Sequence, residues 1–115
     1  MIERRRFVQK ILGNRKENLR VVSGLGTSTW DLMSAGDDTR NFGFIGAMGQ
    51  AVPFSLGLSI AQPNKKILLF TGDGDMLMSL GAMATIANHP MANLTVLVMD
   101  NESYVETGSQ PTATA

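Results

Sequence analysis

Two apolar runs, each followed by a polar loop, constrain the fold of this chain most strongly. Lys66–Thr71 (KILLFT) is apolar from Ile67 to Phe70, and Leu94–Met99 (LTVLVM) is apolar except for Thr95. Apolar runs of this kind are typical of parallel strands that helices cover on both faces. The two segments therefore predict a parallel sheet inside an α/β domain.

The segments between and before these runs alternate in the way such a sheet requires. In chain order we predict a helix over 1–12, a strand over 19–22, a helix over 28–35, an extended segment over 41–45, a helix that ends at residue 61 with Pro53 in its first turns, a strand over 66–71, a helix over 77–88 and a buried strand over 94–99. This alternation predicts an α/β fold with a doubly wound parallel sheet. No helix follows the last strand, so we expect one domain, 1–115, that leaves a sheet edge uncovered and is incomplete at its C-terminal end or completed by another polypeptide.

Composition narrows the class of protein. With 43% hydrophobic and 17% charged residues, the chain should fold around an apolar core. It contains no cysteine, which excludes disulfides, Cys-ligated zinc and iron–sulfur clusters held by this chain. The apolar runs are far shorter than the ~20 residues of a membrane span. We expect a soluble, cytoplasmic protein without a membrane partner.

Charge is concentrated at the N-terminal end. The first twenty residues hold seven of the ten Lys and Arg but only Glu3 and Glu17 of the ten acidic residues. Such a segment can bind nucleic acid, lie on an anionic membrane, serve as a transit peptide, or form a solvated face beside a partner subunit. Nothing downstream supports nucleic-acid binding, so we favour the last interpretation.

Chemistry-bearing residues follow the two best strands. Gly72-Asp73-Gly74-Asp75 and Asp100-Asn101 should lie side by side, because ligands of parallel sheets bind beyond the carboxyl ends of the strands. Glycines allow close approach of a ligand, and the helix expected to start near Leu77 would direct N–H groups and its positive dipole end at an anion. The oxygens of Asp73 and Asn101 suit Mg²⁺. The pattern indicates a metal-bridged diphosphate.

The spacing of these residues resembles a known family. Gly-Asp-Gly, 26 intervening residues and Asn match the thiamine diphosphate (ThDP) motif, and Gly46-Ala47-Met48-Gly49 is similar to a segment of the same enzymes. The chain thus resembles the pyrophosphate-binding domain of ThDP- and Mg²⁺-dependent enzymes that act on 2-oxo acids.

The resemblance implies a role for each matching residue. Asp73, the Asn101 side-chain oxygen and the Ser103 carbonyl would bind Mg²⁺. Gly72 would allow close approach of the diphosphate, Gly74 and Asp75 would donate backbone N–H groups to it, Ser28 would bond the distal phosphate, the Gly46 carbonyl would accept from the aminopyrimidine amine, and the Met48 side chain would bend the cofactor into a V.

One residue that the family needs is missing. The activating Glu of ThDP enzymes lies on a separate pyrimidine-binding domain, and none of Glu3, Glu17, Glu102 and Glu106 has that context. The resemblance therefore implies a pyrimidine-binding (α) subunit or domain as partner, an active site at a subunit interface, and a hetero-oligomer. The single histidine, His89, is expected to end a helix or lie in a loop.

The stretch from Asp100 to Thr112, which we expect to form a polar loop as far as Gln110, is the most discriminating part of the sequence. Its Thr-Gly-Ser-Gln, and the run from Asn41 to Gly49, are similar to the sulfopyruvate decarboxylase β subunit and phosphonopyruvate decarboxylase group, although Asp75 and Ser109 depart from that pattern. A 2-oxo acid decarboxylase is the favoured function.

Two alternatives stay open. The first is a β subunit of a 2-oxo acid:ferredoxin oxidoreductase or a part of an acetolactate synthase-like enzyme, although such oxidoreductase subunits normally carry cluster-binding cysteines. The second is a non-catalytic nucleotide- or diphosphate-binding module, which the lack of a P-loop and of a full Gly-x-Gly-x-x-Gly disfavours.

Overall fold

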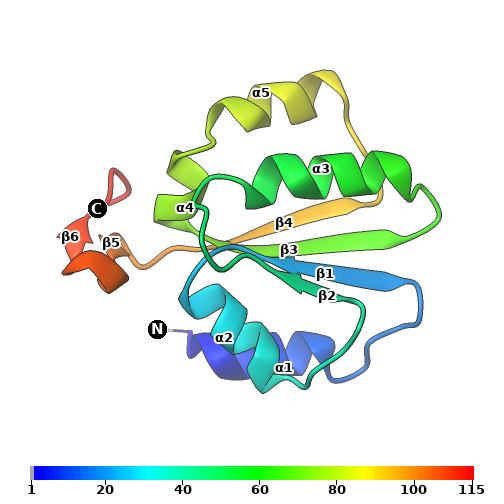
Figure 1. Cartoon of the computed structure of the whole chain (residues 1–115), viewed down its shortest axis with the longest axis horizontal. Helices are drawn as coiled ribbons and strands as arrows, with labels where there is room; N and C mark the ends of the chain where they lie inside the picture. Colours follow the sequence, from blue (N-terminus) through cyan, green and yellow to red (C-terminus); the bar gives the residue numbers. More distant parts are fainter. Residues whose placement is uncertain (1) are drawn as a thin grey trace.

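Four parallel strands form the centre of the computed structural model, which describes residues 2–115 (Figure 1). Their order in the sheet is β2-β1-β3-β4, and Val21 of β1 pairs with Asn41 on one side and Leu68 on the other. A separate antiparallel pair, β5 and β6, follows the sheet. The elements are α1 (Arg4–Leu12), β1 (Leu19–Ser23), α2 (Thr27–Ser34), β2 (Asn41–Gly43), α3 (Ala51–Ala61), β3 (Lys66–Gly72), α4 (Asp73–Leu77), α5 (Gly81–Asn88), β4 (Leu94–Met99), β5 (Ser103–Tyr104), the 3₁₀ helix η1 (Val105–Thr107) and β6 (Gln110–Pro111).

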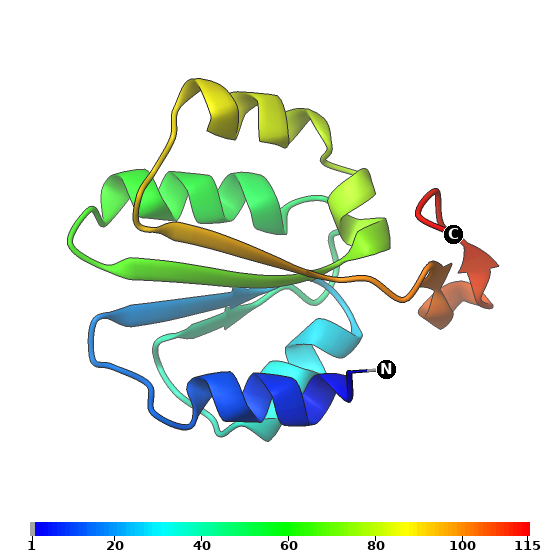
Figure 2. The ribbon, with the colours of Figure 1, turned by 180° about the vertical axis from the view of Figure 1, so that it is seen from behind.

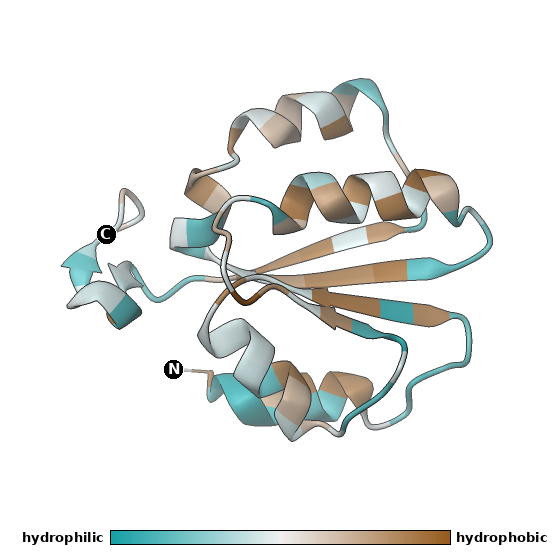
Figure 3. Cartoon of the chain, in the orientation of Figure 1, coloured by the Kyte–Doolittle hydropathy of each residue, from teal (hydrophilic) through white to brown (hydrophobic). Residues whose placement is uncertain are grey.

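Helices cover both faces of the sheet. Helices α1 and α2 lie on one face, and α3 and α5 lie on the other, which two opposite views show (Figures 1 and 2). Because successive side chains of a strand point to opposite faces, Leu68 and Phe70 of β3 enter one core while Ile67 and Leu69 enter the other. Hydrophobic colour accordingly runs along the central strands (Figure 3). The predicted doubly wound α/β fold is confirmed.

The expectation that 94–99 is a buried strand is wrong. No residue of β4 is fully buried, and Val98 is 44% exposed. Strand β4 is the last of the sheet, so it pairs only with β3, and helix α5 beside it has no buried residue. It is the sheet edge that the sequence predicts to be uncovered.

The single helix predicted over 77–88 is also wrong. Helix α4 begins at Asp73, directly after β3, and ends at Leu77, and α5 begins at Gly81. Tighter turns join them, in which the Ser79 and Leu80 N–H groups bond to carbonyls three residues earlier. Ser79 and Gly81 are poor helix formers, which favours a break at this point.

The opening helix is shorter than predicted. Helix α1 starts at Arg4 because the Glu3 carboxylate caps it, accepting a 3.0 Å hydrogen bond from the Arg6 N–H. Met1 lies outside the described residues. The loop predicted from Asp100 to Gln110 contains β5 and η1 and leads into β6, so it is more ordered than its polar sequence suggests.

Candidate functional site

The two polar loops predicted to be neighbours meet at the carboxyl edge of the sheet. Strands β3 and β4 pair in register up to Gly72 opposite Met99. The residues that follow each strand are therefore adjacent, and the Asn101 N–H points to the Asp73 Oδ1 at 3.5 Å. The prediction that these loops adjoin is confirmed.

A pocket of about 120 Å³ opens between these loops. Gly46 does not line it, since this glycine is exposed in the turn before α3. The other eight residues assigned from the sequence all do, namely Ser28, Met48, Gly72, Asp73, Gly74, Asp75, Asn101 and Ser103. The fold thus gathers residues from the segments that follow each of the four parallel strands around one concave site.

Asp73 is one of two buried carboxylates that line this pocket, with only 2% of its surface exposed. Its Oδ2 accepts hydrogen bonds from the Thr112 hydroxyl at 2.5 Å and the Thr114 hydroxyl at 3.1 Å. Burial raises the pKa of Asp73, but the bonds from Thr112, the Asn101 N–H and Thr114 outweigh burial, so the pKa lies below its ordinary value. The carboxylate is therefore ionised at neutral pH and available as an oxygen donor.

The other candidate metal-binding oxygens near Asp73 are neutral. The Asn101 side-chain oxygen lies in the same loop and accepts from the Ser103 N–H at 3.2 Å. Residues 2–115 contain no group of three or more His, Cys, Asp and Glu arranged to hold a metal. One carboxylate, one amide oxygen and the Ser103 carbonyl would together suit Mg²⁺ completed by ligand oxygens and water, rather than zinc or a transition metal.

The helix that begins at this pocket is α4, which starts at Asp73 rather than near Leu77. Its first turn consists of Asp73, Gly74 and Asp75, whose N–H groups precede the first intrahelical bonds. The Tyr104 ring lies so close to Gly74 that a Cβ there would stand 2.4 Å from the ring. A larger residue at position 74 would collide with Tyr104, so glycine allows the Tyr104 ring to pack against the first turn of α4.

The opposite wall comes from the loop between β1 and α2. Ser28 lies in the first turn of α2 and is 5% exposed. Its neighbour Thr29 donates to the carbonyls of Gly24 at 3.0 Å and Phe44 at 3.1 Å. Thr29 therefore holds this loop against the turn that carries Met48.

Sequence reasoning missed several residues of the pocket. Arg4, Tyr104 and Glu106 line it. Arg4 Nε contacts the buried Asp31 carboxylate, which Arg5 also reaches, so the basic opening segment is partly neutralised within the chain. No motif links residues 27 positions apart, and only the tertiary packing of α1 on α2 brings them together.

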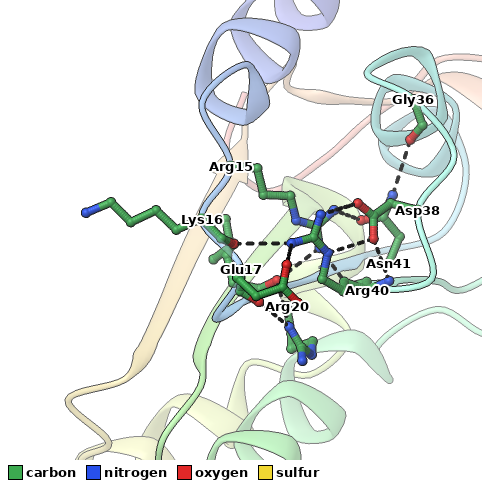
Figure 4. Close-up of polar contacts among 9 residues, drawn as sticks. Arg15, Lys16, Glu17, Arg20, Gly36, Asp38, Arg40 and Asn41 are labelled. Carbon is green, nitrogen blue, oxygen red and sulfur yellow. Dashed lines mark hydrogen bonds and ion pairs between the residues drawn. The ribbon is translucent and has the colours of Figure 1, made fainter.

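A second polar cluster lies at the opposite edge of the sheet (Figure 4). Arg15 is nearly buried and donates to the carbonyls of Leu19 at 3.1 Å and Arg40 at 2.9 Å. The Arg40 guanidinium pairs with Asp38 at 2.6 Å and with Glu17 at 3.1 Å. Arg15 and Arg40 are thus paired with carboxylates, and the cluster joins the segments that precede β1 and β2.

The sequence predictions also concern His89 and the lengths of the apolar segments. His89 ends helix α5 and is exposed, as expected. Across residues 2–115, no helix has the length and apolar character that crossing a membrane requires.

The fold and the pocket together define a class of protein. They are those of a parallel α/β domain with a concave site beyond the carboxyl ends of its strands, which is where such domains bind their ligands. Residues 25–115 match the family described as thiamine pyrophosphate enzyme, C-terminal TPP binding domain, and the chain belongs to this family.

Relatives share most of this chain. Sulfopyruvate decarboxylase subunit beta of Methanothermobacter thermautotrophicus is 37% identical over 112 residues, covering 97% of this chain and 60% of the relative. Phosphonopyruvate decarboxylase of Streptomyces viridochromogenes is 35% identical over 105 residues, covering 91% of this chain and 26% of the relative. A solved structure of 2-oxoglutarate:ferredoxin oxidoreductase from Magnetococcus marinus, with 2-oxoglutarate, coenzyme A and succinyl-CoA bound, has a TM-score of 0.72 and 25% identity, covering 91% of this chain and 35% of that chain. The chain thus spans 60% or less of the length of these proteins.

Proposed function

We propose that residues 1–115 form the pyrophosphate-binding domain of a ThDP- and Mg²⁺-dependent 2-oxo acid decarboxylase. The observation that carries this proposal is the meeting of the buried Asp73, the Asn101 side chain and the first turn of α4 at one pocket. An ionised carboxylate and neutral oxygens beside free N–H groups can hold a cation and a diphosphate together.

Each residue has a defined role in this proposal. Asp73, the Asn101 side-chain oxygen and the Ser103 carbonyl would hold Mg²⁺. On the wall of the pocket, Ser28 would bond the distal phosphate. The backbone of Gly72, Gly74 and Asp75 would bind the diphosphate. The Gly46 carbonyl would accept a hydrogen bond from the aminopyrimidine amine, and the Met48 side chain would lie under the thiazolium.

The proposed site is completed by a partner. Pockets for cofactors usually enclose ~300–1,000 Å³, whereas this pocket encloses about 120 Å³. Relatives named as β subunits support a second subunit, and we propose that it contributes a pyrimidine-binding domain with the activating Glu. The active site would then lie at the interface of a hetero-oligomer.

The substrate that we propose is a 2-oxo acid with a second anionic group, sulfopyruvate or phosphonopyruvate. Support comes from relatives of 37% and 35% identity that are named for these two decarboxylations. When bound, ThDP would supply a C2 carbanion as the nucleophile for the 2-oxo carbon and a thiazolium ring as the sink for the electron pair released with CO₂. This chain would hold and orient the cofactor.

CO₂ release tests this function. The chain is assayed alone and with its co-purified partner, using sulfopyruvate, phosphonopyruvate and pyruvate, each with Mg²⁺ and ThDP. We expect no turnover by the chain alone and turnover of one anionic 2-oxo acid by the assembly. Enzyme-like turnover by the chain, with no second polypeptide detectable by mass spectrometry, would contradict the split site.

A second candidate is a β subunit of a 2-oxo acid:ferredoxin oxidoreductase, which the TM-score of 0.72 favours. The absence of cysteine in this sequence weighs against a cluster on this chain. Adding coenzyme A and an electron acceptor to the same assay separates the candidates, because only the oxidoreductase would reduce the acceptor.

A further inference from the structure

The Asp75 side chain links two segments of the pocket that are distant in sequence. Asp75 is 5% exposed, and its Oδ1 accepts a 2.6 Å hydrogen bond from the Gly49 N–H. Its Oδ2 accepts a 2.6 Å bond from the Thr71 hydroxyl at the end of β3. One carboxylate therefore joins the turn before α3 to the strand and helix that carry Asp73.

A third segment packs against the same carboxylate. A Cβ built at Gly24, in the loop between β1 and α2, would lie 2.2 Å from Asp75 Oδ2 and 2.8 Å from the Thr71 hydroxyl. The backbone of this loop is thus in direct contact with the bonded pair of Asp75 and Thr71. The contact explains why position 24 is occupied by glycine, since any side chain would displace the carboxylate.

The turn over 45–49 has little else to hold it. Ile45 is 85% exposed, and Gly49 adopts a φ of 76°, in the left-handed region that favours glycine. The bond from Gly49 to Asp75 is the only hydrogen bond that residues 45–49 make within residues 2–115. The position of Met48, one residue before, depends on it.

We propose that Asp75 is a positioning residue, which fixes the Met48 turn relative to the first turn of α4. The inference rests on the proposed function, in which Met48 would face the thiazolium and α4 would face the diphosphate. The backbone of Asp75 would serve the diphosphate, and its side chain would set the distance between the two ends of the cofactor. Without the carboxylate, we expect the cofactor to stay anchored but lose its productive shape.

Two variants separate this role from a general role in stability. Asp75→Ala removes both hydrogen bonds, whereas Thr71→Val removes only the bond to Thr71 and keeps the one to Gly49. The double variant Thr71→Val/Asp75→Ala leaves only the Gly49 N–H unpaired, so it serves if Asp75→Ala does not fold. Asp75→Asn, which keeps an acceptor oxygen for Gly49, is the conservative rescue.

Amide hydrogen exchange of the chain at Gly49 is the first measurement. We expect exchange to rise by about tenfold in Asp75→Ala and in the double variant, and to stay near the wild-type rate in Thr71→Val and Asp75→Asn. Unchanged exchange at Gly49 in a folded Asp75→Ala protein would overturn the proposal whether or not the chain binds ThDP.

The second measurement uses the chain assembled with its partner, Mg²⁺ and ThDP. We expect Asp75→Ala to slow C2–H deuterium exchange of bound ThDP by on the order of 10²-fold while ThDP affinity changes little. Thr71→Val should retain normal exchange. Normal C2–H exchange in Asp75→Ala would refute the positioning role, whereas a wild-type assembly without ThDP affinity would refute the proposed function instead.

Discussion

The Thr112 hydroxyl donates a 2.5 Å hydrogen bond to Asp73, which lies 39 residues earlier in the chain. Both residues are buried. The bond satisfies the Asp73 Oδ2, while Oδ1 receives only a 3.5 Å contact from the Asn101 N–H. Oδ1 therefore keeps the larger acceptor capacity for a cation, and the Thr112 bond helps to keep the carboxylate ionised.

Replacing Thr112 by valine should shift the pH dependence of Mg²⁺ and ThDP binding. The hydroxyl helps to lower the pKa of Asp73, so Thr112→Val should raise that pKa towards its ordinary value. Affinity would then decline at a higher pH than in the wild type as the pH falls. Calorimetric titration of ThDP at several pH values measures this shift, and identical profiles would contradict the role of Thr112.

The Asp38 carboxylate should stabilise the fold in a pH-dependent way. Hydrogen bonds from Arg40 hold the pKa of Asp38 below its ordinary value of 3.8. A carboxyl group whose pKa is lowered by folding contributes stability at pH values above its ordinary pKa. This contribution is lost as the pH falls through the pKa of the folded state. Asp38→Asn should therefore lower the urea midpoint at neutral pH, and the difference from the wild type should shrink below pH 3.8.

A neighbouring residue provides the control for Asp38. Asp37 is exposed and has no hydrogen bond or ion pair within residues 2–115. Asp37→Asn removes the same charge without the contacts to Arg40. An equal loss of stability in both variants would show that net charge, not the pairing, determines the effect.

Leu69 should be among the most costly side chains to shorten. It is fully buried at the centre of β3 in the core between the sheet and α3. Leu69→Ala should lower the free energy of unfolding by about 2–5 kcal/mol, because a cavity remains. Denaturant unfolding compares it with Leu80→Ala, where the side chain is 58% exposed and the expected loss is small.

Met48 should affect catalysis more than cofactor binding. If its side chain bends the cofactor, Met48→Ala in the assembled enzyme should lower kcat with a mild loss of ThDP affinity, and Met48→Leu should retain most activity. A Met that only fills space would instead lower the melting temperature, with activity falling only as the folded fraction falls. C2–H deuterium exchange of bound ThDP, measured beside the melting temperature, separates the two roles.

The sequence predicts the central fold because its signals are local. The run KILLFT becomes β3, buried on both faces, and parallel pairing with β4 then brings Asp73 and Asn101 together. The burial of β4 could not be read from LTVLVM, because an edge strand and a central strand can share the same apolar run. What decides between them is the number of neighbouring strands.

The details of the site are set by contacts that local patterns do not encode. Asp75 lies only two residues after Asp73, yet its carboxylate accepts hydrogen bonds from Gly49 and Thr71. Arg4 reaches the pocket only because α1 packs on α2. Pairs separated by 26 or 27 positions depend on tertiary packing, so a single sequence gives no indication of them.

The central claim is that Asp73 anchors Mg²⁺ and with it the ThDP diphosphate. Calorimetric titration of ThDP, with and without Mg²⁺, into the chain assembled with its partner tests this claim for the wild type, Asp73→Ala and Asp38→Ala. The last variant removes the same charge at the opposite edge of the sheet. We predict Mg²⁺-dependent binding to the wild type and Asp38→Ala and none to a folded Asp73→Ala protein, whereas unchanged affinity in Asp73→Ala would contradict the assignment of this site.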